Sequence, residues 1–422
     1  MKHFLPQEAP WLFDSNLQAL LEACSQGGEE ARVVGGAVRN TLLGESVSDI
    51  DIATTTFPQE TAKRAKKLGF QVVLTGVNFG TVTVIARGQS YEVTTLRADM
   101  ETDGRYAKVC FRRDWKVDAE RRDFTINALY ADRNGRIYDD VGGLKDIEKR
   151  ILRFIGNAED RIREDYLRIL RFFRLFAWIG VGYPDPEALK ASARLKEGLH
   201  GLSAERVWSE LKKLFCAPDP VRSLMWMHQS RVLTVVLPEM EKWGIDSINA
   251  LVDTEKTLSW KIDPMLRLQS IVLPDVVRMK AMSRRLRFSN AEKNRLVQWA
   301  MASPIQGDMP DQKLKEHIYR EGRQPVLDRL QLTFAGMRAR IADDGNALFA
   351  VDHYTRLDFI TRNWKIPVFP VNGQDLLALG FNQGPEIGSI MAELKNLWIA
   401  FGFQQDKAAL LSFVRKKASC DR

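Results

Sequence analysis

The feature that most constrains the fold is a glycine pair between a short β-rich run and a helix, with a second β-rich run close behind. The run Ala31–Val34 has the apolar, β-branched composition of a strand, and Gly35 and Gly36 interrupt it. Residues 37–43 then have the composition of a helix, and residues 49–53 have that of a second strand. This succession predicts the start of an α/β head.

The second strand alternates carboxylates with isoleucines. Side chains at alternate positions of a strand share a face, so Asp49 and Asp51 point the same way, about 6–7 Å apart, while Ile50 and Ile52 face a core. Such a pair can share two divalent ions about 4 Å apart, as two-metal phosphoryl transfer requires. Oxygen ligands favour Mg²⁺, or alternatively Mn²⁺, over zinc. We therefore expect Asp49 and Asp51 to be metal-binding and catalytic, with Glu92 either a third metal-binding carboxylate or an exposed strand charge.

The glycine turn is suited to bind phosphate. The amides of Gly35 and Gly36 can approach a triphosphate closely, and the dipole of the following helix favours an anion at its N-terminus. Arg39, one turn into that helix, adds a charged donor. Taken singly, a glycine pair is usually a turn and a carboxylate pair is usually a solvated strand end. Their combination in one unit favours the functional interpretation.

Beyond the second strand, the pattern of apolar residues changes once, from mixed strand and helix signals to helical spacing. Asn134-Gly135 lies between two β-rich runs, which is a strong hairpin signal. From Leu144 onward apolar residues recur at helical spacing, and Ser289 with Glu292 predicts a capping box. The sequence therefore predicts an α+β protein in which a mixed head is followed only by helices. We expect domains at residues 1–147, 148–225, 226–300 and 301–422.

Composition narrows the choice of partners. The 62 lysines and arginines exceed the 54 aspartates and glutamates, and the formal net charge of +8 is compatible with binding nucleic acid. No apolar run approaches the roughly 20 residues of a membrane helix, and the N-terminus lacks the pattern of a secretory or transit peptide. The 4 cysteines form no CxxC pair. We expect a cytoplasmic protein with free thiols and without a disulfide, a zinc site or a membrane anchor.

The segments VVGGAVRN and SDIDIAT resemble the polymerase-β-like nucleotidyltransferases, in particular the branch of class II CCA-adding enzymes and bacterial poly(A) polymerases. In that family the glycine pair begins a GGxVRD motif, and this chain has Asn40 in place of the aspartate. The resemblance implies a polymerase-β-like head followed by a helical neck, body and tail. It also implies that C, C and A are added to the 3′ end of tRNA from CTP and ATP without a nucleic-acid template.

Two further segments of the head resemble motifs of the same family. RRDFTINAL resembles its sugar-recognition motif, in which Arg122 would contact phosphate while Asp123 and Asn127 would bind ribose hydroxyls. Residues 97–105 resemble its flexible loop, from which Arg105 would reach a triphosphate. Taken alone, the RRDFTINAL segment would be interpreted as a charged turn before a hairpin. Its place downstream of the carboxylate strand favours the functional interpretation.

The segment EDYLRILRFFR contains the candidates for base selection. Asp165 and Arg168 have the spacing of neighbours on a helix, so they can hold one another in place. Cytosine and adenine both present an amino donor beside a ring-nitrogen acceptor, which a carboxylate and a guanidinium match. The alternative is a salt-bridged helix surface, but the segment resembles the family's EDxxRxxR motif, which acts as an amino-acid template. The resemblance implies that Asp165 and Arg168 read the base, and that Arg171 and Arg174 contact the nucleotide.

Residues 201–215 resemble the next motif of the family, and we interpret Arg206 and Glu210 within it as braces between neighbouring helices. The resulting hypothesis is a CCA-adding tRNA nucleotidyltransferase that uses CTP, ATP and Mg²⁺ and binds the tRNA 3′ end, with no protein partner implied. The alternatives are a bacterial poly(A) polymerase, an enzyme that adds only CC or only A, and an RNA-binding protein that has lost catalysis.

Overall fold

The protein is described by a computed structural model that covers residues 4–5, 9–74, 76–103, 106–341, 346–381 and 383–420. Two compact units make up the chain. The first runs to Ile245 and includes short pieces at 262–264 and 285–287, and the second contains most of the rest. Strands occur only in the first unit of the described chain, so the predicted α+β class is confirmed. The four-domain division remains a prediction.

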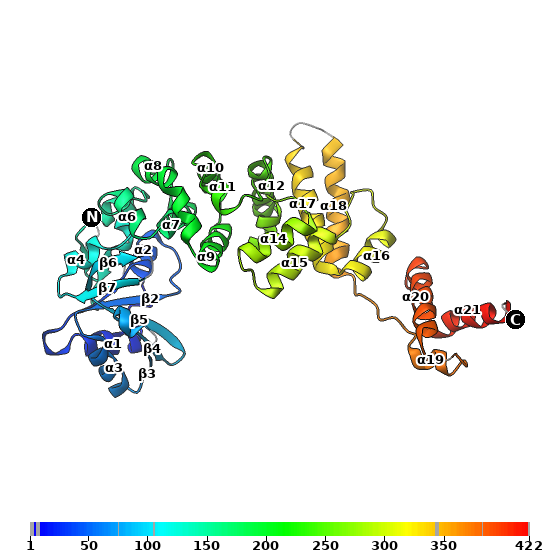
Figure 1. Ribbon diagram of the computed structural model, residues 1–422, viewed down its shortest axis with the longest axis horizontal. Helices are drawn as coiled ribbons and strands as arrows, with labels where there is room; N and C mark the ends of the chain where they lie inside the picture. Colours follow the sequence, from blue (N-terminus) through cyan, green and yellow to red (C-terminus); the bar gives the residue numbers. More distant parts are fainter. Residues whose placement is uncertain are drawn as a thin grey trace. The chain divides into compact units, whose positions relative to one another are not determined.

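A seven-stranded sheet in the order β3-β4-β5-β2-β1-β8-β9 forms the centre of the first unit (Figure 1). Its strands are β1 (Ala31–Val34), β2 (Ile50–Thr54), β3 (Gln71–Val73), β4 (Thr81–Ala86), β5 (Gln89–Thr95), β8 (Leu129–Ala131) and β9 (Ile137–Asp139). β2 and β5 run parallel, whereas the other neighbouring pairs are antiparallel. The hairpin predicted at Asn134-Gly135 is confirmed, because it joins β8 to β9.

Helices and a second β-element surround this sheet. The helices are α1 (Ser15–Cys24), α2 (Gly36–Leu43), α3 (Pro58–Lys67), α4 (Trp115–Glu120) and α5 (Gly143–Glu148), with short 3₁₀ turns η1 (Gln26–Gly28), η2 (Val77–Phe79) and η3 (Thr125–Asn127). The segment predicted to be a flexible loop instead forms a separate hairpin of β6 (Arg97–Asp103) and β7 (Tyr106–Phe111). Strand pairing satisfies its backbone groups, which a loop would leave to water. Gly104 and Arg105 lie outside the described residues.

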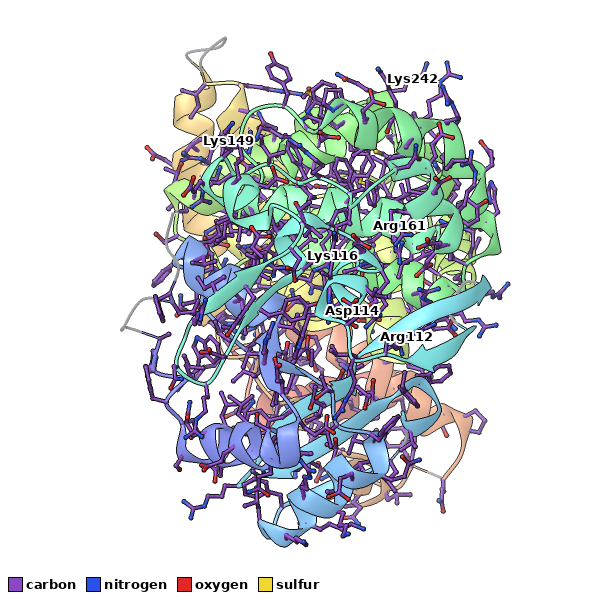
Figure 2. All side chains as sticks on the ribbon, turned by 90° about the vertical axis from the view of Figure 1, so that its left-hand side faces the viewer. Arg112, Asp114, Lys116, Lys149, Arg161 and Lys242 are labelled. Atoms are coloured by element: carbon purple, nitrogen blue, oxygen red, sulfur yellow. The ribbon has the colours of Figure 1, made fainter. Side chains whose placement is uncertain are left out.

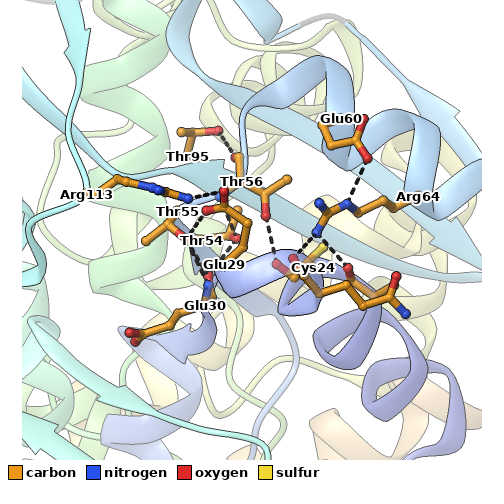
Figure 3. Close-up of polar contacts among 12 residues, drawn as sticks. Cys24, Glu29, Glu30, Thr54, Thr55, Thr56, Glu60, Arg64, Thr95 and Arg113 are labelled. Atoms are coloured by element: carbon orange, nitrogen blue, oxygen red, sulfur yellow. Dashed lines mark hydrogen bonds and ion pairs between the residues drawn. The ribbon is translucent and has the colours of Figure 1, made fainter.

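The end of β2 remote from its carboxylates is anchored by buried threonine hydroxyls (Figure 3). The fully buried Thr54 donates to the Glu30 carbonyl at 2.8 Å and accepts from the Thr56 amide at 3.1 Å. The Thr56 hydroxyl donates to the Cys24 carbonyl at 2.7 Å, and the Thr95 hydroxyl donates to the Thr56 carbonyl at 2.7 Å. These bonds tie β2 to α1 and β5, and they leave the carboxylate pair at its other end.

The remaining helices of the first unit follow the sheet without a long linker. They are α6 (Ala158–Glu164), α7 (Leu167–Ile179), α8 (Pro186–Leu195), η4 (Lys196–Gly201), α9 (Ala204–Phe215), α10 (Val221–Gln229) and α11 (Val232–Val236). Asp114 caps α4 by accepting from the amides of Lys116 at 2.9 Å and Val117 at 3.2 Å, and Figure 2 labels Arg112, Asp114 and Lys116 at this turn. The Arg161 guanidinium of α6 donates to the Glu120 carbonyl at 3.1 Å, which joins α6 to the end of α4.

The second unit is helical throughout its described residues. Its helices are α12 (Gly244–Thr257), α13 (Pro264–Gln269), α14 (Val276–Arg285), α15 (Asn290–Met301), α16 (Asp311–Glu321), α17 (Arg323–Ala339), α18 (Asn346–Asn363), α19 (Gly373–Leu377), α20 (Pro385–Ala400) and α21 (Lys407–Cys420). The capping box predicted from Ser289 and Glu292 is confirmed at the start of α15. Separate apolar clusters form around Phe334 and around Trp398. None of the described helices has the length and apolar character needed to cross a bilayer.

Thr54→Val preserves the shape of the side chain but removes the acceptor of the buried Thr56 amide. We expect the free energy of unfolding to fall by about 1–3 kcal/mol, because a buried donor loses its partner. Chemical denaturation of the full chain measures the change. The matched control is Thr83→Val at a half-buried position of β4, for which we expect a change within about 0.5 kcal/mol. Equal losses in both variants would contradict an anchoring role for the Thr54 hydroxyl.

Candidate active site

A cavity of about 560 Å³ opens in the first unit between the strand-rich head and helices α7 and α9. Most of the site residues predicted from the sequence line it, namely Gly35, Gly36, Arg39, Asp49, Asp51, Arg122, Asp123, Asn127, Arg171 and Arg174. Asp165, Arg168 and Glu92 are not among its lining residues. The rest of the wall was not predicted, and it consists of Asn40, residues 45–48, Leu175, Trp178, Ile179, Lys213 and Cys216.

The acidic wall of the cavity is the start of β2. Asp49 immediately precedes the strand and Asp51 lies within it, and both side chains are exposed to the cavity. Ile50 and Ile52 are 7% and 1% exposed, so they face the core as their alternation with the carboxylates predicts. Glu92 of the parallel neighbour β5 is the register partner of Asp51. Two strands therefore bring three carboxylates to one end of the sheet.

This wall fits a divalent cation. The side chain of Asp51 is open to the cavity, but the surrounding protein atoms, together with Glu92 and Asp49, raise the pKa of Asp51 from 3.8 to about 6. A cation would relieve this excess of negative charge, and carboxylate oxygens are the ligands that Mg²⁺ and Mn²⁺ prefer. The described part of the chain holds no group of three His, Cys, Asp or Glu side chains arranged to bind a metal. Further ligands would come from substrate or water, and the role of Glu92 as a third ligand remains a prediction.

Beside the carboxylates, the glycine turn at the end of β1 presents a cation, since Val34 is the register partner of Asp51. Gly35 has φ 73°, a left-handed conformation that glycine adopts without strain, and α2 begins directly after it. Arg39 donates to the side-chain carbonyl of Asn127 and to that of Asn40, the latter at 3.1 and 2.8 Å. Burial and the nearby Arg174 lower the pKa of Arg39 to about 10. A bound anion would stabilise this charged guanidinium, as the predicted contact with phosphate requires.

Asn40 links the glycine turn to the rim of the cavity. Its side-chain oxygen accepts from Arg39, and its side-chain nitrogen donates to the Ser46 carbonyl at 2.9 Å. The nucleotidyltransferase family that the sequence resembles usually has aspartate at this position. An aspartate can accept from Arg39 but cannot donate to a carbonyl. The amide therefore performs both tasks without adding charge, and it supports residues 45–48 in the wall.

Asp123 joins the head side of the cavity to α7. Its carboxylate accepts from Arg171 of α7 at 2.6 and 2.8 Å and from the side chain of Asn127 at 3.0 Å. The amide of Phe124 donates to it as well, at 2.9 Å. Burial acts to raise the pKa of Asp123, but the Arg171 ion pair and these hydrogen bonds outweigh it and lower the pKa to about 2. The carboxylate is therefore ionised at neutral pH, with most of its accepting capacity already used.

Arg122 owes its orientation to a residue that the sequence analysis did not identify. Asp118, one helical turn earlier and only 1% exposed, accepts from Arg122 at 3.0 and 3.2 Å, from Arg121 at 2.5 and 2.8 Å and from the Tyr130 hydroxyl at 2.8 Å. Burial opposes ionisation of Asp118, but Arg122 and Arg121 lower its pKa to about 2. An acid four residues before an arginine on a helix is the signal that would have revealed the pair.

The prediction that Asp165 and Arg168 are neighbours on one helix is wrong. α6 ends at Glu164, Asp165 is extended with φ −156° and ψ 106°, and α7 starts at Leu167. The reason is local: the Asp165 carboxylate accepts from the Leu167 amide at 3.1 Å, and aspartate is favoured at such helix starts. Asp165 and Arg168 therefore do not brace one another across a helical turn.

Each of the two predicted base readers has a different partner instead. Asp165 accepts from Arg206 of α9 at 2.6 Å. Arg168 donates to Glu164 at 2.6 Å and to the Arg161 carbonyl at 2.9 Å. The partners of both side chains are residues that do not line the cavity. The contact of Asp165 and Arg168 with a base remains a prediction.

The interpretation of the α9 pair as braces is confirmed. Arg206 contacts Asp165 as described above, and Glu210 accepts from Arg174 of α7 at 2.5 Å. Glu210 is 7% exposed, so its charge requires a partner. These ion pairs hold α7 against α9, and they set the orientation of Arg174 in the cavity wall.

Asp51→Asn removes the charge that makes the acidic wall unfavourable. The pKa of Asp51 is raised to about 6 in the folded chain, so the folded state binds a proton at Asp51 more tightly than the unfolded state does. The stability that this proton contributes is therefore lost as the pH rises toward 6. We expect the variant to melt about 1–3 °C higher than the wild type at pH 8 in a metal chelator. This gain should shrink below pH 6. Glu45→Gln, which removes a carboxylate from the rim, is the control, and a lower melting temperature for Asp51→Asn at pH 8 would contradict the repulsion.

Comparison with known proteins connects this geometry to a family. Residues 31–153 match the family model described as the Poly A polymerase head domain, and residues 184–243 match the model described as the probable RNA and SrmB-binding site of polymerase A. The chain is 34% identical over 419 residues to the mitochondrial CCA tRNA nucleotidyltransferase 1 of Danio rerio, covering 95% of this chain and 90% of the relative. It is 30% identical over 407 residues to the CCA-adding enzyme of Streptococcus pneumoniae, covering 94% and 96%.

Solved structures agree on the fold. The CCA-adding enzyme of Bacillus stearothermophilus in complex with CTP matches with a TM-score of 0.72 at 24% identity, over 96% of this chain and 99% of that chain. The enzyme of Thermotoga maritima complexed with tRNA matches with a TM-score of 0.68 at 19% identity, over 98% of each chain. Given the identity to the curated relatives over nearly their whole length, this chain belongs to the family of CCA tRNA nucleotidyltransferases, the CCA-adding enzymes.

Proposed function

We propose that this protein adds C, C and A to the 3′ end of tRNA, using CTP and ATP and no nucleic-acid template. The observation that supports it best is that one cavity combines the carboxylate pair Asp49 and Asp51 with the cationic wall formed by Arg39, Arg171 and Arg174. A phosphoryl-transfer site needs both, because the attacking hydroxyl must be activated and the leaving phosphates must be neutralised. Membership of the CCA-adding family supports the substrates.

In the proposed reaction the 3′ oxygen of the tRNA attacks the α-phosphorus of the nucleotide. A new phosphodiester bond forms, the bond to the β-phosphate oxygen breaks, and pyrophosphate leaves with the electron pair. Asp49 and Asp51 would hold Mg²⁺, or Mn²⁺ in its place, which supplies charge neutralisation and lowers the pKa of the attacking hydroxyl. The proton of the attacking hydroxyl passes to water, so that atoms and charge balance.

The cationic wall would bind the triphosphate. A bound phosphate would stabilise the charged form of Arg39 in particular. Burial and Arg174 lower the pKa of Arg39, and its partners in the chain are neutral amides. The amides of Gly35 and Gly36 add donors at the start of α2. Arg122 is held at the cavity by Asp118, so it can contact phosphate without first being ordered.

Base selection would depend on Asp165 and Arg168. A carboxylate can accept from the amino group shared by cytosine and adenine, and a guanidinium can donate to their ring nitrogen. Arg206 and Glu164 hold the two groups in position, which limits the entropy lost when a base binds. Uracil and guanine would leave these groups without matching partners, and this favours their rejection. Asp123 and Asn127, already bonded to one another, would face the ribose.

The remaining expectations complete this proposal. The head, residues 1–147, would carry the chemistry, the neck, 148–225, would read the base, and the body, 226–300, would connect them to a tRNA-binding tail, 301–422. The net charge of +8 suits a polyanionic partner. Cys24 is a buried free thiol, which fits a reducing compartment such as the cytoplasm.

Incubation of the full chain with a tRNA that ends at the discriminator base tests the proposal. Each nucleotide is supplied alone and in combination with Mg²⁺, and the products are sequenced. We expect C, C and A with CTP plus ATP, and no growth beyond three residues. A long adenylate tail would identify a poly(A) polymerase, addition of CC or A alone would identify a partial enzyme, and binding without incorporation would identify an RNA-binding protein. Asp49→Ala is expected to fold normally and to abolish incorporation.

Base choice provides a separate prediction. Arg168→Ala and Asp165→Ala should each reduce the preference for CTP and ATP over UTP and GTP about 10- to 100-fold, because each loses a hydrogen bond from a charged group. The readout is kcat/KM for all four nucleotides. The control is Arg163→Ala, which removes an exposed arginine of α6 that is paired with Glu159. Unchanged nucleotide ratios in the Asp165 and Arg168 variants would contradict the amino-acid template.

A further inference from the structure

One part of the cavity wall has no role in the proposal above. Trp178, near the end of α7, lines the cavity and leaves 43% of its surface exposed. Other large side chains of this chain are exposed too, Trp243 among them, but the Trp178 indole lines a cavity and so offers a ligand there a flat face on which to stack. The ring is also held in place, because its nitrogen donates to the Lys213 carbonyl of α9 at 3.0 Å.

The neighbours of Trp178 form a wall with a charged edge. Leu175 and Ile179 lie on the same helix beside the indole, and Cys216 follows at the end of α9. Lys213 is exposed and also lines the cavity. A flat aromatic face beside a single ammonium group matches a nucleotide, which offers a planar base and a phosphate.

The length of α7 distinguishes this nucleotide from the incoming one. Arg168 and Trp178 are ten residues apart on α7, which corresponds to about 15 Å along a helix. One base cannot contact both residues at that separation. If the incoming base is read at Arg168, the ring that covers Trp178 belongs to another nucleotide, and the cavity also contains Asp49 and Asp51, where the 3′ hydroxyl must arrive.

We propose that Trp178 and Lys213 form the subsite for the 3′-terminal nucleotide of the RNA that is being extended. The terminal base stacks on the indole, and the ammonium group of Lys213 faces the adjoining phosphate. Stacking tolerates any base, so the subsite can accept the discriminator base, the first C and the second C in turn. This inference rests on the proposed function, and it adds the residues that position the acceptor end of the substrate.

A cycle that combines a protein change with an RNA change tests the subsite. The probes are a tRNA ending at the discriminator base and the same tRNA with an abasic ribose at that position. Trp178→Ala should raise KM for the intact tRNA about tenfold, with KM for CTP unchanged. The abasic tRNA should raise the wild-type KM by a similar factor, and combining both changes should add little. Trp178→Phe, which keeps an aromatic face, should restore most of the affinity.

The controls separate this subsite from general damage. Trp243→Ala removes an indole that is 41% exposed and is not among the cavity-lining residues. This variant should keep the wild-type difference in KM between the intact and the abasic tRNA. Lys213→Gln should reduce the slope of log KM against log salt by about 0.7. Two results would overturn the subsite alone, provided that the wild type incorporates nucleotides. One is that Trp178→Ala and the abasic end raise KM independently of one another. The other is that Lys213→Gln leaves the salt slope unchanged. Absence of incorporation by the wild type would overturn the proposed function, and the subsite with it.

Discussion

The ion pair between Asp123, on the head side of the cavity, and Arg171, on α7, is the contact on which the rest of the site depends. The Asp123 carboxylate also accepts from Asn127, and Asn127 in turn accepts from Arg39 of α2. Because a buried charge is stable only when it is paired, this network holds α7 at one position against the head. The cavity between the carboxylates of β2 and the cations of α7 exists because of that restraint.

The cations around the cavity differ in whether a carboxylate neutralises their charge. Most of those that line the cavity have a carboxylate partner, in the pairs Arg122–Asp118, Arg171–Asp123 and Arg174–Glu210. Outside the lining, Arg168 is paired with Glu164 and Arg206 with Asp165. Arg39 donates instead to the amide oxygens of Asn40 and Asn127, and its pKa is lowered to about 10 by burial and by Arg174. Among the carboxylates, Asp51 has its pKa raised to about 6. The cavity thus holds one positive and one negative charge that their surroundings leave unfavourable, and a metal-bound triphosphate has the charges that satisfy both.

Where local chemistry decides structure, the sequence was a reliable guide. The glycine turn, the alternation in β2, the hairpin at Asn134-Gly135 and the capping box at Ser289 were all predicted, because each depends on residues within a few positions of one another. The continuous helix through Asp165 was wrong for an equally local reason. Apolar spacing continues across the break and so predicts one helix, whereas the break itself follows from the preference of aspartate for helix starts.

The sequence by itself therefore determined the α+β class, the carboxylate pair, the glycine turn and, through its resemblance to a family, the reaction expected of them. Only the tertiary structure decided which charges meet. Asp123 and Arg171 are 48 residues apart, Asp165 and Arg206 are 41 apart, and the Trp178 indole is held by a carbonyl 35 residues away. Short-range periodicity has no information about such pairs, because partners are chosen by how helices pack and by the need to neutralise each buried charge.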